Sequence, residues 1–286
     1  METGERAHQV LITGGSAGIG LGLASRYLAA GHRVLVTGRN AGTLAAVSEE
    51  LPGLETFAND IADPRQRERL AAHVRRVMPD LDVVISNTGI QRRVGIAADD
   101  APWAEAQHEI DVLLAGPVHL ARLLTPHLLG HGRPSVYVNV TSGGAFLPQP
   151  FAPLYSAAKA ALHSYTVNLR HALRATPCRV VELVPPAVAT RLAGPGPNHG
   201  ADPDEFCDTV FPLLDGSHPV VGYGPTAQPD FTDRVAAGHR AFEAAASRFG
   251  VPLYRPDGTV ADQASPSSSP SWSGSPVSPV ARPGRR

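Results

Sequence analysis

The chain has 286 residues, of which 43% are hydrophobic and 18% charged, and its formal net charge at pH 7 is -1. This length suits one large α/β domain with an ample core, and the near-zero net charge argues against nucleic-acid and anionic membrane partners. Two cysteines are too few for a disulfide framework, and the polar N-terminus contains no apolar signal core. No uninterrupted apolar run approaches the roughly 20 residues of a membrane span. We therefore expect a cytoplasmic protein.

Short β-branched runs alternate with longer helical patterns along most of the chain. The sequence predicts strands at residues 9–13, 33–37, 54–58, 81–86, 135–140, 179–184 and 219–223. It predicts helices at residues 19–30, 41–51, 64–78, 102–129, 153–174, 202–214 and 230–249. Strands that are apolar throughout and alternate with helices indicate a parallel sheet covered on both faces. We therefore expect a Rossmann-type doubly wound α/β fold of three layers in a single domain.

The composition changes twice in the second half of the chain. We expect residues 1–255 to form the folded domain, with a Gly- and Pro-rich substrate loop inserted at about 187–214. Residues 256–286 are rich in Ser, Pro and Gly, and such a segment cannot bury enough apolar surface to offset its ordering entropy. We expect a disordered tail there.

A glycine-rich turn joins the first predicted strand to the first helix. Glycines let backbone N–H groups approach a pyrophosphate closely at the positive end of a helix. A turn in this position predicts a nucleotide site. The residues that we expect to form it are Gly14, Ser16, Gly18, Ile19 and Gly20.

Cofactor selectivity is expected at the end of the second strand, where an acidic residue would bind the free ribose hydroxyls of NAD. This position carries no carboxylate, and Gly38 is followed by Arg39. A guanidinium suits a 2′-phosphate, although an exposed Arg at a helix start would look the same. We predict a preference for NADP(H) over NAD(H).

The chain contains a single lysine, Lys159, four residues after Tyr155. Residues four apart lie on one face of a helix, so the ammonium can stand beside the phenol and lower its pKa. All other basic residues are arginines, which indicates that this position needs a compact ammonium rather than a planar guanidinium. Ser142 follows the strand at 135–140, at the sheet edge where such folds place their chemistry.

Together these motifs resemble the short-chain dehydrogenase/reductase family over about residues 7–250, and most closely its DltE-type oxidoreductase subgroup. The match includes the glycine-rich turn, Asp60 after the third strand, the Asn87 segment after the fourth, the set of Ser142, Tyr155 and Lys159, and the segment that begins at Pro185.

The resemblance implies hydride transfer between a nicotinamide and a carbonyl or secondary alcohol, in an enzyme acting on CH–OH groups. Tyr155 would be the general acid or base, Ser142 would bind the substrate oxygen, and Lys159 would hold the ribose hydroxyls. The resemblance also implies that the cofactor meets Asp60, Ile61, Asn87, Gly89, Pro185, Val188 and Thr190.

Substrate residues are expected on the loops after the fourth, fifth and sixth strands. We assign Gln91, Arg92, Gly143, Gln149 and Arg191 to this group. The arginines could meet an acidic or phosphate-bearing substrate, or could be solvated surface residues. We expect no metal site, because the twelve histidines form no convincing ligand set, and His127 and His131 fall at a helix end that we expect to be solvated.

Leu113 stands where the family usually has an Asn that positions a water chain from the active lysine to solvent. Leucine has no donor or acceptor, so another group carries the relay, turnover is slowed, or Asp111 serves instead. Two alternatives to an active oxidoreductase therefore remain. The protein could be an NADP-binding regulator or scaffold with impaired catalysis, or a lyase or epimerase on the same fold. The family resemblance also favours a homodimer or homotetramer through the helices at 102–129 and 153–174.

Overall fold

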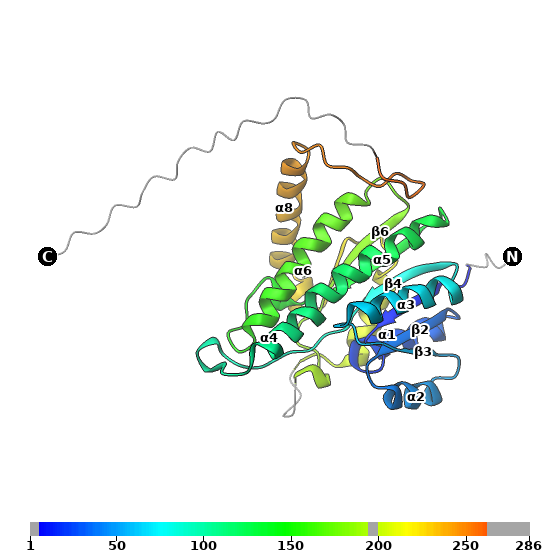
Figure 1. Ribbon diagram of the computed structural model, residues 1–286. Coiled ribbons are helices and arrows are strands. Elements are labelled where there is room, and N and C mark those ends of the chain that lie inside the picture. The colour runs from blue at the N-terminus through cyan, green and yellow to red at the C-terminus, as the bar shows by residue number, and fades with distance from the viewer. Residues whose placement is uncertain (1–5, 194–199, 262–286) are drawn as a thin grey trace.

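A seven-stranded parallel sheet forms the centre of the computed structural model, which describes residues 6–193 and 200–261 (Figure 1). The sheet order is β3-β2-β1-β4-β5-β6-β7. The strands are β1 Gln9–Thr13, β2 Arg33–Gly38, β3 Glu55–Ala58, β4 Leu81–Ser86, β5 Ser135–Val140, β6 Cys178–Val184 and β7 Val220–Gly222. The order reverses at β1 and β4, and this switch point is where open α/β sheets bind ligands. The predicted Rossmann-type fold is confirmed.

Helices cover both faces of the sheet. They are α1 Gly18–Ala29, α2 Ala41–Glu50, α3 Pro64–Val77, α4 Trp103–Ile110, α5 Gly116–Gly130, α6 Pro153–Ala172, α7 Pro203–Val210 and α8 Pro229–Ala246. Successive strand residues face opposite sides. On β1, Val10 and Ile12 belong to the buried cluster with α1, α2 and α7, whereas Leu11 belongs to the cluster with α3, α5 and α6. Two cores therefore hold the sheet between helical layers.

The predicted strands and helices are all present, with ends that differ by a few residues, except for one division. The helix predicted at 102–129 is split into α4, a π-helical turn at Asp111–Ala115, and α5. Nothing in the residue pattern marks this turn. Gly116 is required after it, because a Cβ at this position would lie 2.8 Å from Cγ1 of Ile61. A π-turn inside an α-helix is frequent at functional sites.

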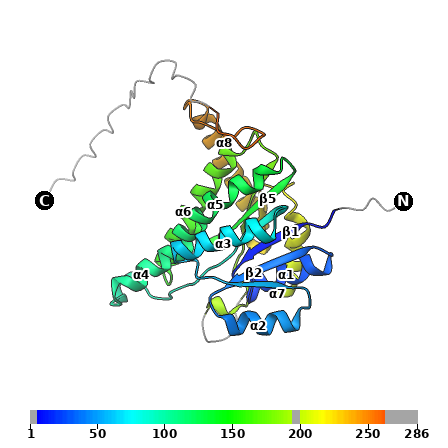
Figure 2. The ribbon, with the colours of Figure 1, turned by 45° about the vertical axis from the view of Figure 1, so that its right-hand side comes forward.

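The long helical stretch from α4 to α5 is also the most apolar of the fold. Among the described residues, only Trp103–Gly130 is long and apolar enough to cross a membrane, and 56% of its most apolar window is buried inside the fold. Leu120 and Leu124 pack against α3 and the sheet. Figures 1 and 2 show α4 beside α6, with α8 at the opposite side of α6. We therefore assign this stretch to the core.

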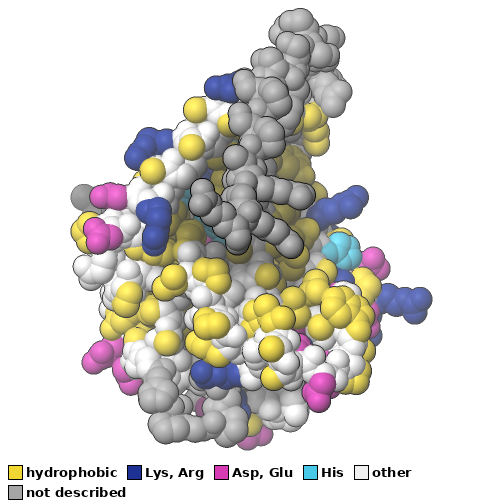
Figure 3. All heavy atoms as spheres, turned by 90° about the vertical axis from the view of Figure 1, so that its left-hand side faces the viewer, with side chains coloured by type: hydrophobic (Ala, Val, Ile, Leu, Met, Phe, Trp, Pro, Cys, Tyr) yellow, Lys and Arg dark blue, Asp and Glu magenta, His cyan; other side chains and the backbone are white. Residues whose placement is uncertain are grey.

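Apolar side chains are also exposed at the end of the molecule where α4 lies. Figure 3 shows hydrophobic side chains gathered across the middle of this face. Large exposed apolar residues of the neighbouring loops and of α4 include Ile96, Trp103, Leu147 and Phe151.

The described part of the chain extends past the domain boundary predicted at residue 255. Residues up to Ala261 fold back onto the ends of α5 and α6, where the Tyr254 N–H donates to the Ala172 carbonyl and Gly258 lies against Leu129. The first residues of the tail predicted at 256–286 thus contact the domain, and its remainder at 262–286 lies outside the described residues.

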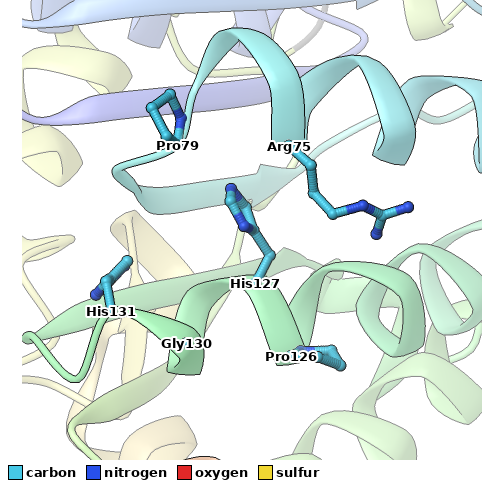
Figure 4. A pocket seen from close by; sticks show the side chains of 6 residues that line it. All are labelled: Arg75, Pro79, Pro126, His127, Gly130 and His131. Atoms are coloured by element: carbon cyan, nitrogen blue, oxygen red, sulfur yellow. The ribbon is translucent and has the colours of Figure 1, made fainter.

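His127 and His131 lie at the end of α5 as predicted, and both are partly exposed. Their Nε2 atoms lie 2.9 Å from the carbonyl oxygens of Met78 and Leu81, because the end of α5 packs beside the turn between α3 and β4. Figure 4 shows the two imidazoles in a surface hollow of about 380 Å³, at the edge of the sheet opposite the carboxyl ends of the strands. Each contact joins a side chain to the main chain, and we assign them a structural role.

Candidate active site

A pocket of about 1560 Å³ opens at the carboxyl ends of the central strands. Its volume exceeds the roughly 300–1,000 Å³ of a site for one small ligand, which suits a dinucleotide together with a substrate. The sequence-predicted residues that line it are Gly14, Ser16, Gly18, Ile19, Arg39, Ile61, Asn87, Gly89, Gln91, Ser142, Gly143, Gln149, Tyr155, Lys159, Pro185, Val188, Thr190 and Arg191. Three predicted residues do not line it, namely Gly20, Asp60 and Arg92.

The glycine-rich turn forms one end of the pocket. Gly14 has a left-handed backbone, with φ of 65°, and a Cβ there would lie 2.9 Å from Cα of Thr88. Gly20 serves packing rather than lining, since a Cβ would lie 2.4 Å from the Gly14 carbonyl oxygen. Asn87 fixes the turn by donating to the carbonyls of Thr13 and Gly14 at 3.0 and 3.1 Å.

The first turn of α1 faces this end of the pocket without a side-chain cap. Ala17, the N-cap residue, provides no side-chain hydrogen bond, and Gly18 and Ile19 line the pocket. The uncapped N–H groups and the positive end of the helix dipole provide donors for an anion. This end of the pocket therefore fits the pyrophosphate of a dinucleotide.

The residues at the ends of β2 and β3 surround the adjoining part of the pocket. Arg39 is exposed there, with Nη1 3.3 Å from Nε2 of His108. Asp60 instead turns its carboxylate to the Ala62 N–H, and its neighbour Asn59 lines the pocket. The Asn59 side chain is buried, and neither amide atom has a hydrogen-bond partner among the described residues. A bound nucleotide would supply the partner that such a buried amide requires.

Ser142, Tyr155 and Lys159 come together at the other end of the pocket, and each is more than 90% buried. Ser142 begins a short 3₁₀ turn, and its Oγ accepts the Gly144 N–H at 3.0 Å. Lys159 lies one helical turn after Tyr155 on α6, with Nζ 5.8 Å from the centroid of the tyrosine ring. The same Nζ donates to the Val140 carbonyl at 2.7 Å.

Burial controls the acidity of both groups. Burial raises the pKa of Tyr155 above its ordinary value, although hydrogen bonding to Ser142 acts in the opposite direction. Burial also lowers the pKa of Lys159 to about 8. The sequence led us to expect a net lowering of the pKa of the phenol by Lys159, but loss of water is the largest influence on Tyr155 and the Lys159 ammonium is bound to the Val140 carbonyl. Tyr155 is protonated at neutral pH.

Leu113 packs directly on this set, in a fully buried cluster with Ala152, Tyr155 and Ala158. Asp111 does not replace the usual Asn, because its carboxylate accepts the Gln107 side chain at 3.0 Å and its charge acts on Arg67 of α3. A side chain without hydrogen-bonding atoms thus covers one flank of the tyrosine ring.

Glu109, one turn before Leu113, is a site residue that the sequence pattern did not reveal. It is fully buried, and its Oε1 accepts the Arg92 N–H at 3.0 Å, whereas Oε2 has no partner within the described chain. Burial raises the pKa of Glu109, and its negative charge raises the pKa of Tyr155. No repeated motif accompanies this glutamate, so only the fold connects it with the tyrosine.

Arg92, which we expected to contact the substrate, does not line the pocket. Arg92 points its guanidinium at Asp99, with Nη2 2.6 Å from Oδ1, so a bidentate ion pair occupies it. Gln91 and Gln149 both line the pocket, and their side chains are 3.4 Å apart. Residues of the loop after the 3₁₀ turn and of α8 complete the wall. Phe146 and Leu147 lie in the stretch at 143–149 that we expected to line the pocket, whereas Phe151, Asp230, Phe231 and Arg234 were not expected there.

Comparison with known proteins gives consistent results. A model of the short chain dehydrogenase family matches residues 8–198. The uncharacterized oxidoreductase DltE of Bacillus subtilis is 44% identical over 183 residues, which cover 64% of this chain and 72% of that protein. The NADP-dependent 3-hydroxy acid dehydrogenase YdfG of Salmonella typhimurium is 29% identical over 178 residues, which cover 62% of this chain and 71% of that protein.

Solved structures extend the similarity beyond the family model. A short chain dehydrogenase from Burkholderia cenocepacia in complex with NADP has a TM-score of 0.70 and 26% identity, and the match covers 84% of this chain and 97% of that one. The family model ends at residue 198, so α7, β7 and α8 lie outside it.

Proposed function

Because the chain belongs to the short-chain dehydrogenase family, we propose that it is an NADPH-dependent oxidoreductase that interconverts a carbonyl and a secondary alcohol. The observation that carries the proposal is the convergence of Ser142, Tyr155 and Lys159 in one pocket with an uncapped helix start and an exposed Arg39. The relative named for NADP dependence and the solved structure that holds NADP support the choice of cofactor.

The reduced nicotinamide supplies the hydride in this chemistry. Ser142 Oγ accepts the Gly144 N–H and its hydroxyl also contacts Tyr155, so a substrate carbonyl oxygen that replaces the phenol as acceptor would be oriented by both hydroxyls. Tyr155 then donates its proton to that oxygen. The Lys159 ammonium stabilises the phenolate that remains, and the low dielectric of the buried site strengthens this attraction.

The pKa of Tyr155 favours the reductive direction. A phenol whose pKa is raised keeps its proton at neutral pH and can donate it to a carbonyl oxygen. Alcohol oxidation requires the opposite state, in which the phenolate accepts a proton. We therefore propose that Tyr155 serves carbonyl reduction at neutral pH, and that alcohol oxidation, which needs the phenolate, requires a higher pH.

Arg39 is the residue that we propose for the 2′-phosphate. Replacing Arg39 with Ala should weaken NADPH binding by about 10- to 100-fold, because one charge-assisted hydrogen bond is worth about 1.5–3 kcal/mol. NADH affinity should remain unchanged. Fluorescence titration with each cofactor measures the ratio of the NADPH and NADH dissociation constants. The control is Arg191→Ala, which alters an arginine of the same pocket. Equal losses for both cofactors in Arg39→Ala would contradict the assignment.

Glu109 should tune the acidity of the catalytic tyrosine. Replacing Glu109 with Gln removes the negative charge that raises the pKa of Tyr155, so the pKa should fall and the rate of reduction should decline at a lower pH than in the wild type. The Gln side chain keeps an acceptor for the Arg92 N–H. Steady-state pH profiles test this, with the exposed Glu105→Gln of the same helix as control. A profile shifted to higher pH, or unshifted, would show that Glu109 does not act on Tyr155.

The function is tested by NADPH oxidation against a panel of ketones and aldehydes. We expect activity with carbonyl compounds that fit an apolar wall, because Phe146, Leu147 and Phe151 line the substrate end. We propose that the segment at 187–214 supplies part of this wall, through its described residues Ala187 to Leu192. Tight NADPH binding without turnover of any compound would favour the regulatory alternative.

We also propose that the enzyme is a cytoplasmic homodimer or homotetramer that associates through α4, α5 and α6. The exposed Trp103 of α4 supports an interface at this end of the molecule, and the free buried Cys178 and Cys207 fit a reducing compartment. Sedimentation equilibrium measures the mass, and a monomer would contradict the assembly.

A further inference from the structure

A second cluster of reactive side chains lies outside the pocket. His163 of α6, Glu182 of β6 and His239 of α8 place two ring nitrogens and one carboxylate oxygen within 4.8 Å of one another. None of the three lines the catalytic pocket, and the reaction proposed above uses none of them. They come from three elements that are distant in sequence.

Glu182 is the centre of this cluster. It is fully buried, its Oε1 accepts the Thr141 hydroxyl at 2.7 Å, and its Oε2 lies 2.9 Å from Nδ1 of His163. A carboxylate that is removed from water requires a positive partner. Arg170 acts on Glu182 only through its charge, because its guanidinium donates to the Val180 and Pro219 carbonyls, so a cation bound between the carboxylate and the imidazoles can be the direct partner.

A ring nitrogen of His239 lies within 4.8 Å of the ligand oxygen of this carboxylate. Its Nε2 is buried and lacks a hydrogen-bond partner throughout residues 6–193 and 200–261, and its ring stacks on His163 with 6.0 Å between centroids. Phe231 and Val235 pack on Val184 of β6 and fix this face of α8 against the sheet. This face of α8 therefore holds the imidazole of His239 near the carboxylate of Glu182.

We propose that His163, Glu182 and His239 form a binding site for a zinc ion. Two imidazole nitrogens and one carboxylate oxygen, with a fourth position for water, are a common zinc donor set, and nitrogen donors disfavour magnesium and calcium. Bonds of about 2.0–2.2 Å place tetrahedral ligand atoms about 3.3 Å apart, and rotation of the half-exposed His239 can close the remaining distance.

The site would fasten α8 to the centre of the fold. Asp230, Phe231 and Arg234 of α8 line the pocket, so an ion that holds this helix against α6 and β6 also fixes the substrate wall. Thr141 keeps its hydrogen bond to Oε1 of Glu182 as an outer-shell contact and directly precedes Ser142.

The test uses the full chain after dialysis against EDTA, titrated with zinc chloride by calorimetry and with cobalt chloride by visible absorption. We expect one ion per chain, the strong visible bands of tetrahedral cobalt, a higher melting temperature with zinc, and slower hydrogen exchange in residues 229–246. His239→Gln and Glu182→Gln should weaken binding at least about tenfold, which is the low end of what a lost outer-shell partner costs.

His171→Gln is the matched control, because His171 also joins α6 to α8, through Glu243 at 3.0 Å, but has no third ligand. It should leave zinc affinity unchanged. Absence of binding at submillimolar zinc would overturn the proposal, and so would equal affinity in the wild type and His239→Gln, which would assign the ion to other histidines. His239→Gln decides the question even if Glu182→Gln fails to fold, because His239 is half-exposed.

Discussion

Replacing Tyr155 with Phe should lower the rate of carbonyl reduction by about 10²- to 10⁴-fold, the usual contribution of a positioned general acid. The change removes only the phenol oxygen, and the ring keeps its packing against Leu113 and Ala158. NADPH affinity and the melting temperature should therefore change little. Stopped-flow measurement of NADPH oxidation under saturating cofactor separates the chemical step from binding.

Tyr165→Phe is the control for this experiment, because it removes a second phenol from the same helix. Tyr165 is half-buried in the core beside α5 and does not line the pocket, so activity should be retained. Wild-type activity in Tyr155→Phe would show that another group donates the proton, and the assignment of Ser142 and Lys159 as its partners would then lose its basis.

Residues that follow the strands could be placed from sequence because the fold places them by rule. Ser142 and Asn87 come directly after buried strands, and the carboxyl ends of parallel strands meet at one edge of a sheet. Tyr155 and Lys159 then follow from the spacing of a helix. The direction in which an individual side chain points cannot be predicted from these rules. Arg92 turns to Asp99, which a strand-end rule does not anticipate.

Site residues that are brought together by packing between distant elements left no recognisable pattern in the sequence. Glu109 reaches Tyr155 only because α4 lies beside α6, and the π-helical turn after it is not encoded by any spacing. The cluster of His163, Glu182 and His239 could not be anticipated from the sequence, since three elements far apart in the chain bring these residues together. Motif spacing in a sequence detects only ligands that share one element or one turn. The three residues of this cluster come from three different elements.

We expect the reaction to need the buried charge of Lys159, although this charge lowers the stability of the fold. Its pKa is lowered from 10.5 to about 8 by burial, so the charged form destabilises the fold by on the order of 3 kcal/mol at neutral pH. Replacing Lys159 with Met removes this penalty and leaves the Val140 carbonyl without its donor, which costs about 1 kcal/mol. The variant should melt about 4–8 °C higher at pH 7 and lose at least about 100-fold in the rate of reduction.

The pH dependence of that gain follows from the sign of the shift. The unfolded chain binds the proton of this lysine more tightly than the folded chain does, so the penalty is complete below about pH 8, where both states are protonated. It declines between about pH 8 and 10.5 and is absent above that range, where both states are neutral. Thermal melts of wild type and Lys159→Met at pH 7 and pH 10 should therefore converge as the pH rises.

Lys159→Arg separates charge from shape at the same position. It keeps the cation but adds a planar guanidinium where the side chain is only 3% exposed, so overpacking should lower stability by about 1–3 kcal/mol. Activity should be lost in both variants, with opposite changes in melting temperature. An active Lys159→Arg enzyme would show that any cation suffices beside Tyr155, and the presence of the only lysine of the chain at this position would then have no chemical explanation.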